Sequence, residues 1–416
     1  MVKDNINSTI NELLNVLDEQ TFMKIINVLD IDKYVKKLTA YKFFELLVFA
    51  QVNDIDSLTH LAKQSKDEQE LQDYLDLNGI STAQLSRKQC HLPPVMFEKI
   101  FRYLTRQIQS QLKQTPIVGD IGRLHVIDSS TMSMSLTQYP WATFRKTKAG
   151  VRLHLRVVVT KDVTIPDKAV LLPANHADRT QMNELVAIDP DALYLFDRGY
   201  IDYKQFETYC CEGVRFITRL KKNAKIEVIT EHAPDPEHLI DQDAEVFLGD
   251  EQNGTKMRHP LRLIRTQDQE GNEITIVTSC FDLSAKEIGD LYRYRWKIET
   301  FFKWMKQHFK IKTFYGKSEH AVYNQIWIAL ITYCLQVFLQ LKSGHQGPLI
   351  ELKRSLRTYL FRDFKAFVQS LFRAPTRRSR GRVKQDWERE FAIIEAQFSE
   401  GEVSHFDDVT FDPLFI

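Results

Sequence analysis

The sequence predicts an α/β protein, in which a mixed sheet with flanking helices is interrupted by a β-rich insertion and preceded by a helical amino-terminal domain. Apolar residues recur every three or four positions up to about residue 115, which is typical of packed helices. From residue 123 they fall instead in short strand-like segments separated by helix-like ones. With 416 residues, 43% of them hydrophobic, the chain can bury the cores of two or three domains.

Residues 1–115 are predicted to be helical, because INELLNVL, FMKIINVL and KFFELLVFA have helical spacing and almost no β-branched alternation. Ser81 is a suitable cap for a helix that carries Gln84, Arg87 and Lys88. A polar helix start of this kind can enter a DNA groove, and an ordinary surface helix fits the same pattern. Residues 1–115 are therefore a candidate DNA-binding domain.

Residues 116–222 are expected to form the first part of the sheet domain. The strand-like segments are RLHVID, VRLHLRVVV, KAVLLPAN, ALYLFD and VRFITRL, and two helix-like segments, MNELVAI and DYKQFETYCC, lie among them. RLHVID ends in Asp128 and ALYLFD ends in Asp197. Ligands of open α/β sheets gather at strand ends, so both carboxylates are expected to face a crevice.

Residues 223–283 are predicted to be the β-rich insertion, with strands at KIEVIT, AEVFLG, PLRLIR and EITIVTS. Residues 284–345 are predicted to complete the sheet domain, and a capping box at Ser284 and Glu287 is expected to begin the helix that carries Glu299. That helix has an apolar side that should pack on the sheet. The apolar run from Ile326 is shorter than a bilayer requires and contains polar residues, so it is predicted to be a buried core helix.

The charge totals favour no partner, because 56 Lys and Arg balance 55 Asp and Glu to a net charge of +1. The distribution is uneven within residues 346–416, which begin strongly basic and turn acidic from Asp386 onward. The basic part suggests phosphate contact, although two oppositely charged surfaces that pair with each other would give the same pattern. The five cysteines lack CxxC spacing and the amino terminus lacks a signal-peptide pattern, so a cytoplasmic protein without a membrane anchor is expected.

The segment YRYRWKIETFFKWMK is the most informative in the chain. As a helix, it sets Tyr292, Arg295, Glu299 and Lys306 along one side, so that a single carboxylate lies inside a basic and aromatic stripe. Such a stripe suits a polyanion held close to a metal ion. An ordinary solvated helix face would mix both signs of charge more evenly.

Three acids on separate elements, Asp128, Asp197 and Glu299, are candidates for a shared divalent-metal site. Magnesium prefers hard oxygen ligands and leaves positions open for water and phosphate. Taken singly, an aspartate that ends a strand is more often a turn former or a helix cap. Of the nearby histidines, His154 is expected to face solvent or DNA, and His176 is a weaker candidate for reaching the acids.

The order of these motifs resembles the DDE transposases of bacterial insertion sequences, in particular the IS-four family. The signature of that family is Tyr, two residues, Arg, three residues, Glu, six residues and Lys, and the spacing of Tyr292, Arg295, Glu299 and Lys306 matches it without departure. The sequence Asp-Arg-Gly-Tyr that begins at Asp197 matches as well. The resemblance covers roughly residues 120–345 and implies a ribonuclease-H-like catalytic core formed by 116–222 and 284–345.

Carried over by residue, the resemblance implies that Asp128, Asp197 and Glu299 are catalytic and bind two Mg²⁺ ions, with Mn²⁺ as a substitute. Water and then a DNA 3′-hydroxyl would attack a phosphodiester. The DNA-binding residues implied are Tyr292, Arg295, Trp296, Lys303, Lys306 and Arg198. Trp296 is equally suited to stack on a base and to hold the helix in the core.

The resemblance also implies the partners, which are the double-stranded DNA of transposon ends and target, bound by a homodimer in a synaptic complex at the bacterial nucleoid. Cut-and-paste transposition is the expectation. Residues 223–282 contain no Trp or Tyr to receive a flipped base, so a hairpin intermediate is left open. Two alternatives are a nuclease of the same fold without strand transfer and a domesticated DNA-binding protein that no longer reacts.

Overall fold

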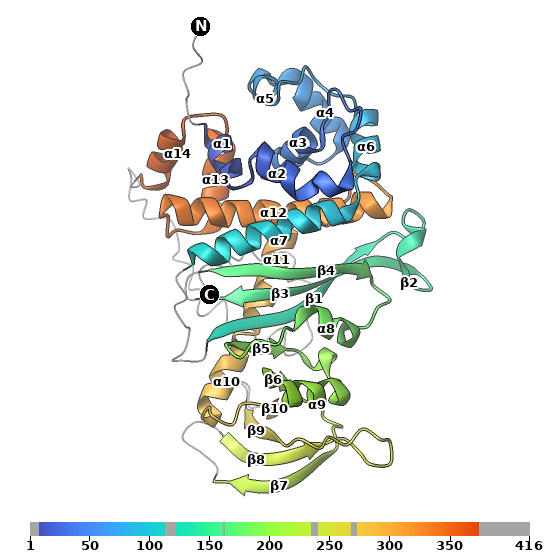
Figure 1. Cartoon of the computed structure of the whole chain (residues 1–416), viewed down its shortest axis with the longest axis vertical. Coiled ribbons are helices and arrows are strands. Elements are labelled where there is room, and N and C mark those ends of the chain that lie inside the picture. Colours follow the sequence, from blue (N-terminus) through green and yellow to red (C-terminus); the bar gives the residue numbers. More distant parts are fainter. Residues whose placement is uncertain (1–7, 113–121, 161–162, 234–239, 268–272, 374–416) are drawn as a thin grey trace, which may run out of the picture.

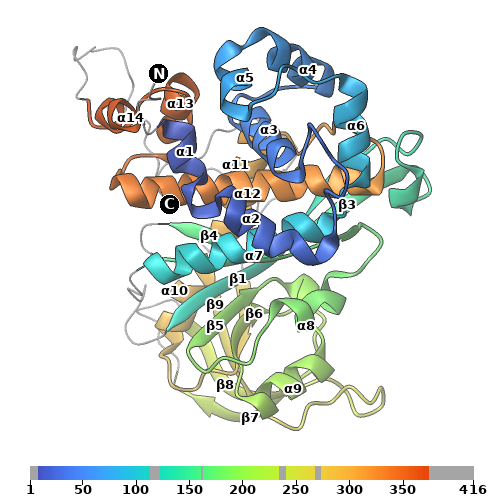
Figure 2. The same cartoon turned by 45° about the horizontal axis from the view of Figure 1, so that its top comes forward.

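The structure is a computed structural model, and it describes residues 8–112, 122–160, 163–233, 240–267 and 273–373. A helical layer lies against one end of a long twisted sheet, whose far end carries the strands of the predicted insertion (Figure 1 and Figure 2). The arginine-rich part of the basic segment, residues 377–382, and the acidic stretch from Asp386 lie outside the described residues.

The amino-terminal part is helical, as its apolar spacing predicts. Ser81 and Gln84 form a capping box at the start of α6, which confirms the predicted cap. Asp32 accepts hydrogen bonds from the backbone of Ala40, at the start of α3, and pairs with Lys88 of α6 at 2.7 Å. The helices are α1 (Thr9–Leu14), α2 (Glu19–Ile26), α3 (Ala40–Val52), α4 (Leu58–Asp67), α5 (Gln69–Leu75), α6 (Thr82–His91) and α7 (Pro94–Gln111).

In the part of the chain that the structure describes, ten strands form one sheet in the order β2-β3-β1-β5-β6-β10-β9-β8-β7, with β4 beside β3. Within it, β4, β3 and β1 are antiparallel, while β1, β5 and β6 are parallel, which is the mixed core expected of a ribonuclease-H-like fold. The strands are β1 (Arg123–Met134), β2 (Thr143–Arg145), β3 (Lys148–Val159), β4 (Thr164–Pro173), β5 (Ala192–Phe196), β6 (Arg215–Arg219), β7 (Ile226–His232), β8 (Ile240–Leu248), β9 (Leu261–Gln267) and β10 (Glu273–Thr278).

The insertion strands continue the same sheet, because β10 pairs antiparallel with β6. Successive residues of β5 point to opposite faces, and both faces are buried. Leu193 and Leu195 join the larger core under the helices, while Tyr194 and Phe196 join a second core with α9 (Tyr203–Glu212) and the strands β8 and β9. The insertion and the first sheet strands therefore share this second core.

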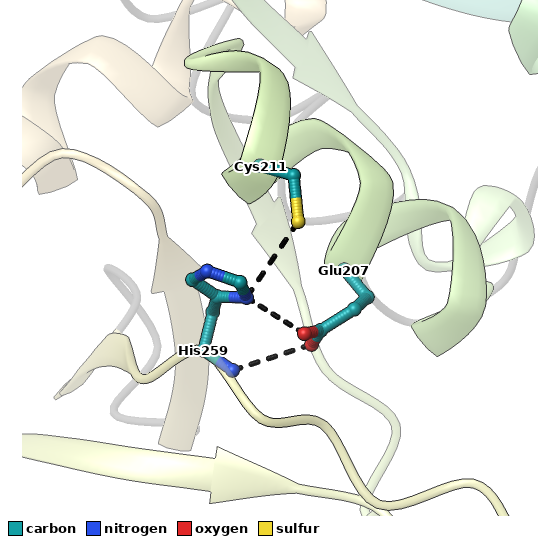
Figure 3. Close-up of side chains that lie close together, drawn as sticks. All are labelled: Glu207, Cys211 and His259. Carbon is teal, nitrogen blue, oxygen red and sulfur yellow. Dashed lines mark hydrogen bonds and ion pairs between the residues drawn. The ribbon is translucent and has the colours of Figure 1, made fainter.

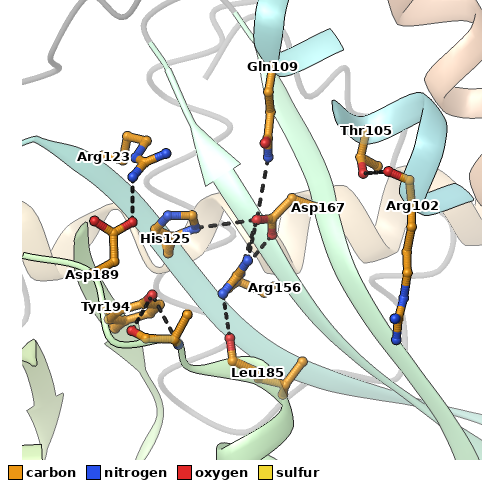
Figure 4. A network of polar contacts seen from close by, with 11 residues as sticks. Arg102, Thr105, Gln109, Arg123, His125, Arg156, Asp167, Leu185, Asp189 and Tyr194 are labelled. Carbon is orange, nitrogen blue, oxygen red and sulfur yellow. Dashed lines mark hydrogen bonds and ion pairs between the residues drawn. The ribbon is translucent and has the colours of Figure 1, made fainter. Parts of the chain in front are cut away.

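An ionic network links the strand β4 to its neighbour β3 and to β1 (Figure 4). Arg156 of β3 makes a two-pronged pair with Asp167 of β4, with 2.9 Å from Nε to Oδ1 and 2.6 Å from Nη2 to Oδ2. The other guanidinium nitrogen donates to the carbonyl of Leu185, at the end of α8 (Met182–Leu185). His125 of β1 stacks on Tyr194 and faces Asp167. Burial lowers the pKa of His125 to about 4, so that this ring is neutral at pH 7.

The apolar run from Ile326 is part of α12 (Glu319–Ser343), which is long and apolar enough to cross a membrane by length and composition. Its apolar window is completely buried inside the protein, against α3, α6 and α7. The prediction of a buried core helix is confirmed. Two further helices follow it, α13 (Leu349–Tyr359) and α14 (Phe364–Leu371), which the sequence patterns did not predict.

The helix predicted to run from the Ser284 capping box through Glu299 is two helices, so that prediction was wrong. The capping box begins α10 (Ala285–Arg293), and α11 (Trp296–His308) carries Glu299. At the junction, the amides of Tyr294, Arg295 and Lys297 bond to carbonyls three residues back, which tightens the turn and redirects the chain. The predicted apolar side of α11 is confirmed, since it is buried on the sheet.

Candidate active site

Asp128 and Asp197 lie side by side on neighbouring parallel strands. The ladder between β1 and β5 ends with the pair Ile127 and Phe196, so each aspartate is the next residue of its strand. Adjacent strands are about 4.8 Å apart, which brings the two carboxylates into one region. Asp197 directly follows β5, as predicted, and precedes the short turn at Arg198–Tyr200, where the amide of Tyr200 donates to the Asp197 backbone carbonyl.

The prediction that Asp128 ends its strand was wrong, because β1 continues to Met134. The extension pairs only with β3, on the side away from β5, and it was not visible in the polar sequence SSTMSM. On the β5 side the ladder does end at this position. Asp128 therefore still faces the crevice left by the end of β5.

Glu299 is in the first turn of α11, which packs across β1. Arg295, the residue just before this helix, forms an ion pair with Glu299, and its Nη1 lies 3.7 Å from Oδ2 of Asp128. The arginine is 9% exposed. It thus bridges two of the three acids and offsets part of their mutual repulsion.

The charges of the three acids act on one another's pKa. The pKa of Asp128 is raised to about 7, first by burial and then by the charge of Glu299, against the opposing effect of Arg295. The pKa of Glu299 is also raised by burial and by Asp197, against the opposing effect of Arg295. Like charges brought together in a partly desolvated place favour a bound cation.

Three hard carboxylates fit the donor set of Mg²⁺ or Mn²⁺. Among the described residues, their oxygens do not all lie within 4.8 Å of one another, and Arg295 lies between Asp128 and Glu299. An ion shared by Asp128 and Glu299 would take the place that Arg295 holds between them.

A fourth carboxylate, Asp178, supports the site from the side, and sequence reasoning did not single it out. The backbone amide of Ser129 donates to the Asp128 carboxylate, and the Ser129 hydroxyl donates to Asp178, both at 2.7 Å. Arg152 donates to the same Asp178 oxygen at 3.1 Å. The residues before Asp178 have neither helical nor strand periodicity. In the sequence, therefore, only its negative charge indicates that Asp178 could belong to the site.

The histidine predictions have different outcomes. His154 was expected to face solvent or DNA, and this was wrong, because its side chain is fully buried on β3 and lies 3.5 Å from Asp178. Burial lowers the pKa of His154 to about 4, which leaves the ring neutral at pH 7. The error arose because β3 has neighbours on both edges and is covered on both faces. His176 is exposed, and Arg152 bonds to its backbone carbonyl.

The aromatic part of the stripe surrounds Arg295. Its guanidinium carbon lies 6.0 Å from the ring centre of Tyr292 and 5.8 Å from that of Trp296, and both rings are half-buried. Burial raises the pKa of Tyr292 to about 12, so its hydroxyl stays protonated. Lys303 and Lys306 lie half-buried further along α11, and Arg198 is exposed beside Asp197.

Comparisons with known proteins agree with this arrangement. Residues 122–335 match the family model of the transposase DDE domain, and residues 5–73 match a domain of unknown function, DUF4372. A protein described as a transposase for insertion sequence element IS5377, from Geobacillus stearothermophilus, is 29% identical over 214 residues, which are 51% of this chain and 55% of that protein.

A second relative, the transposase y4zB of Sinorhizobium fredii, is 30% identical over 249 residues, which are 58% of this chain and 67% of its own length. A third, a transposase for element IS4SA of Synechocystis, is 23% identical over 268 residues, covering 63% of this chain and 73% of the relative. The aligned part spans little more than half of the first relative and two thirds of the second. The DDE-domain match covers half of this chain and includes all three acids, and the protein belongs to the family of transposases with a DDE domain.

Proposed function

We propose that this protein is an insertion-sequence transposase that cleaves transposon ends and joins them to target DNA. The observation that carries the proposal is the convergence of Asp128, Asp197 and Glu299 from β1, β5 and α11, with Arg295 among them. Water would attack a phosphodiester at the transposon end, and the released 3′-hydroxyl would then attack the target.

In this proposal, Asp128, Asp197 and Glu299 hold two Mg²⁺ ions, for which Mn²⁺ can substitute. Bound ions of this kind activate the attacking oxygen and stabilise the leaving one. The residues themselves fix the geometry: the Ser129 amide holds the Asp128 carboxylate, and Arg295 holds Glu299. Rigid support of this kind keeps catalytic groups in productive positions.

The DNA-binding residues are proposed to be Tyr292, Arg295, Trp296, Lys303, Lys306 and Arg198. Arg295 reaches DNA in this proposal only by leaving its carboxylate partners, so its first role is to orient them. Lys303 and Lys306 of α11 and the exposed Arg198 would neutralise DNA phosphates in this proposal. Trp296 keeps both of its proposed roles, as a base stack and as a support for Arg295.

The helical amino-terminal part is proposed to bind the terminal inverted repeats. The exposed side of α6 presents Gln84, Arg87 and His91, which line a recess of about 570 Å³ together with residues of the segment before α3. Lys88, which the sequence also suggested, is engaged with Asp32. We further propose that the protein works as a homodimer, because two ends must be held together, and that it acts in the bacterial cytoplasm at the nucleoid.

Glu299→Ala tests the proposal. Magnesium-dependent cleavage of an end-containing duplex should fall on the order of 10³-fold, because several kcal/mol of transition-state stabilisation are lost. Binding to the ends should survive. Asp290→Ala, an exposed acid of α10 that pairs with Lys286, is the matched control and should cleave normally.

Two readouts distinguish the outcomes of this experiment. If Glu299→Ala loses end binding together with cleavage, the residue is structural and the proposal fails. An assay with pre-cut ends separates joining from cutting, because a nuclease of the same fold would cleave without joining the ends to target DNA.

A further inference from the structure

Three potential metal ligands meet where α9 contacts the segment between β8 and β9 (Figure 3). Glu207 and Cys211 are four residues apart on α9 and so share one face of the helix. His259 comes from the segment that leads into β9. Its Nδ1 lies 2.6 Å from Glu207 Oε1 and 3.9 Å from the sulfur of Cys211, and the three donor atoms lie within 4.8 Å of one another.

The backbone that carries these residues is held in place before any ion binds. The second oxygen of Glu207 accepts hydrogen bonds from the amides of Arg258 and His259, at 2.9 and 3.3 Å. Asp202 caps the start of α9, and Gly213 ends it with a φ of 70°. A carboxylate that already fixes the loop brings the imidazole to the helix without further ordering of the chain.

We propose that Glu207, Cys211 and His259 form a second metal site, for Zn²⁺, separate from the acidic site. A thiolate and an imidazole favour zinc over magnesium, and the single carboxylate is a common third ligand. Three protein ligands leave the fourth tetrahedral position for water. Zinc binds the thiolate, so binding would release the proton of the Cys211 thiol to solvent.

The distances are compatible with this assignment after a small movement. Zinc bonds of about 2.0 to 2.3 Å place tetrahedral ligands roughly 3.5 Å apart. The separation between sulfur and Nδ1 is already close to this value, and Glu207 must withdraw from Nδ1 by about 1 Å. Cys211 is exposed and His259 is half exposed, so an ion can enter from solvent.

The site has a structural consequence, because it joins two parts of the chain. α9 packs on β5 and β6 of the catalytic core, while His259 lies two residues before the start of β9 in the insertion. Zinc would therefore clamp the insertion to the core at a distance from the acids. If no zinc binds, the hydrogen bonds of Glu207 to Arg258 and His259 alone would anchor this segment of the insertion to α9.

The test uses the full chain with Asp128→Asn and Glu299→Gln, which weaken metal binding at the acidic site. Co²⁺ is titrated as a spectroscopic probe for a cobalt–thiolate absorption band, and Zn²⁺ is then added to displace it. One equivalent should bind and produce the band. Cys211→Ser should abolish the band and weaken Zn²⁺ binding about 100-fold or more. Even the loss of a residue that only hydrogen-bonds to a metal ligand weakens metal binding about 10- to 100-fold.

Cys210→Ser is the matched control, because Cys210 is the next residue and its side chain packs against the second core. This variant should keep the band and the affinity for Zn²⁺. Thermal unfolding without metal checks that each variant folds. The proposal is overturned if the parent chain gives no thiolate band, or if Cys211→Ser and His259→Ala bind Zn²⁺ as tightly as the parent does.

Discussion

Arg295 separates two of the carboxylates that the proposed chemistry needs close together, so its geometry decides how the acids are presented. Its guanidinium can contact Glu299 and Asp128 at once because it is planar and carries several donors. The sequence placed Arg295 beside Glu299, but the contact with Asp128 depends on how α11 crosses β1, which no local pattern encodes. The role of Arg295 in holding acids was therefore missed.

Arg295→Lys should lower the rate of cleavage by about 100-fold at saturating DNA. A single ammonium cannot hold both Asp128 and Glu299, and a displacement of catalytic carboxylates by about 1 Å has an effect of this size. The affinity for transposon ends should change little. Single-turnover cleavage and equilibrium binding, measured on the same variant, check the two parts. A variant that cleaves normally at saturation but binds poorly would instead make Arg295 mainly a DNA contact.

At the scale of single elements, the sequence predicted the strands well because alternation and β-branched residues mark them locally. The strands β5, β6 and β10 fall within the segments expected, while β7, β8 and β9 overlap theirs and run two to four residues beyond them. Three features escaped: the extension of β1, the break between α10 and α11, and the two helices after α12. Each depends on a partner distant in sequence or on turn geometry, and hydrophobic periodicity carries information on neither.

The pair of Arg156 and Asp167 joins β3 to β4 with both side chains almost fully buried. Asp167→Asn should lower the free energy of unfolding by about 3 to 5 kcal/mol, because it leaves a buried guanidinium without its opposite charge. Glu273→Gln is the control, since its pair with Arg265 is exposed and should be worth less than about 1 kcal/mol. Urea unfolding compares them, and equal effects would contradict the account.

The helix α3 contains a buried acid that should make stability depend on pH. Burial raises the pKa of Glu45 to about 7, while the Tyr74 hydroxyl donates to it at 2.7 Å. Because the pKa is higher in the folded chain, the protonated acid stabilises the fold below pH 4.5, and this contribution is lost as the pH rises through 7.

Glu45→Gln cannot ionise and keeps an acceptor for Tyr74. The stability of the unsubstituted protein relative to this variant should therefore fall by about 3 kcal/mol between pH 4.5 and pH 8. Urea unfolding at both pH values measures the difference. Parallel pH profiles for the two proteins would show that the Glu45 carboxyl is not perturbed.

For the whole molecule, the fold class was predictable, because helical and strand-like spacing mark it in the sequence. Local motifs mark the three acids as candidates, although Asp128 does not end its strand, and their role stays a prediction. The single continuous sheet was not predictable, because the pairing of β10 with β6 crosses some sixty residues of chain. This pairing makes the insertion an extension of the catalytic sheet. Movements of the insertion should therefore be coupled to β6, next to the strand that ends in Asp197.

The central claim is that the three acids bind the ions needed for cleavage, and Asp197→Cys tests it most directly. A thiolate is a poor ligand for Mg²⁺ and a better one for Mn²⁺. Cleavage by this variant should be lost with Mg²⁺, on the order of 10³-fold, and partly restored when Mn²⁺ replaces it. Equal activity of the variant with both ions, at the level of the unsubstituted protein, would contradict the account.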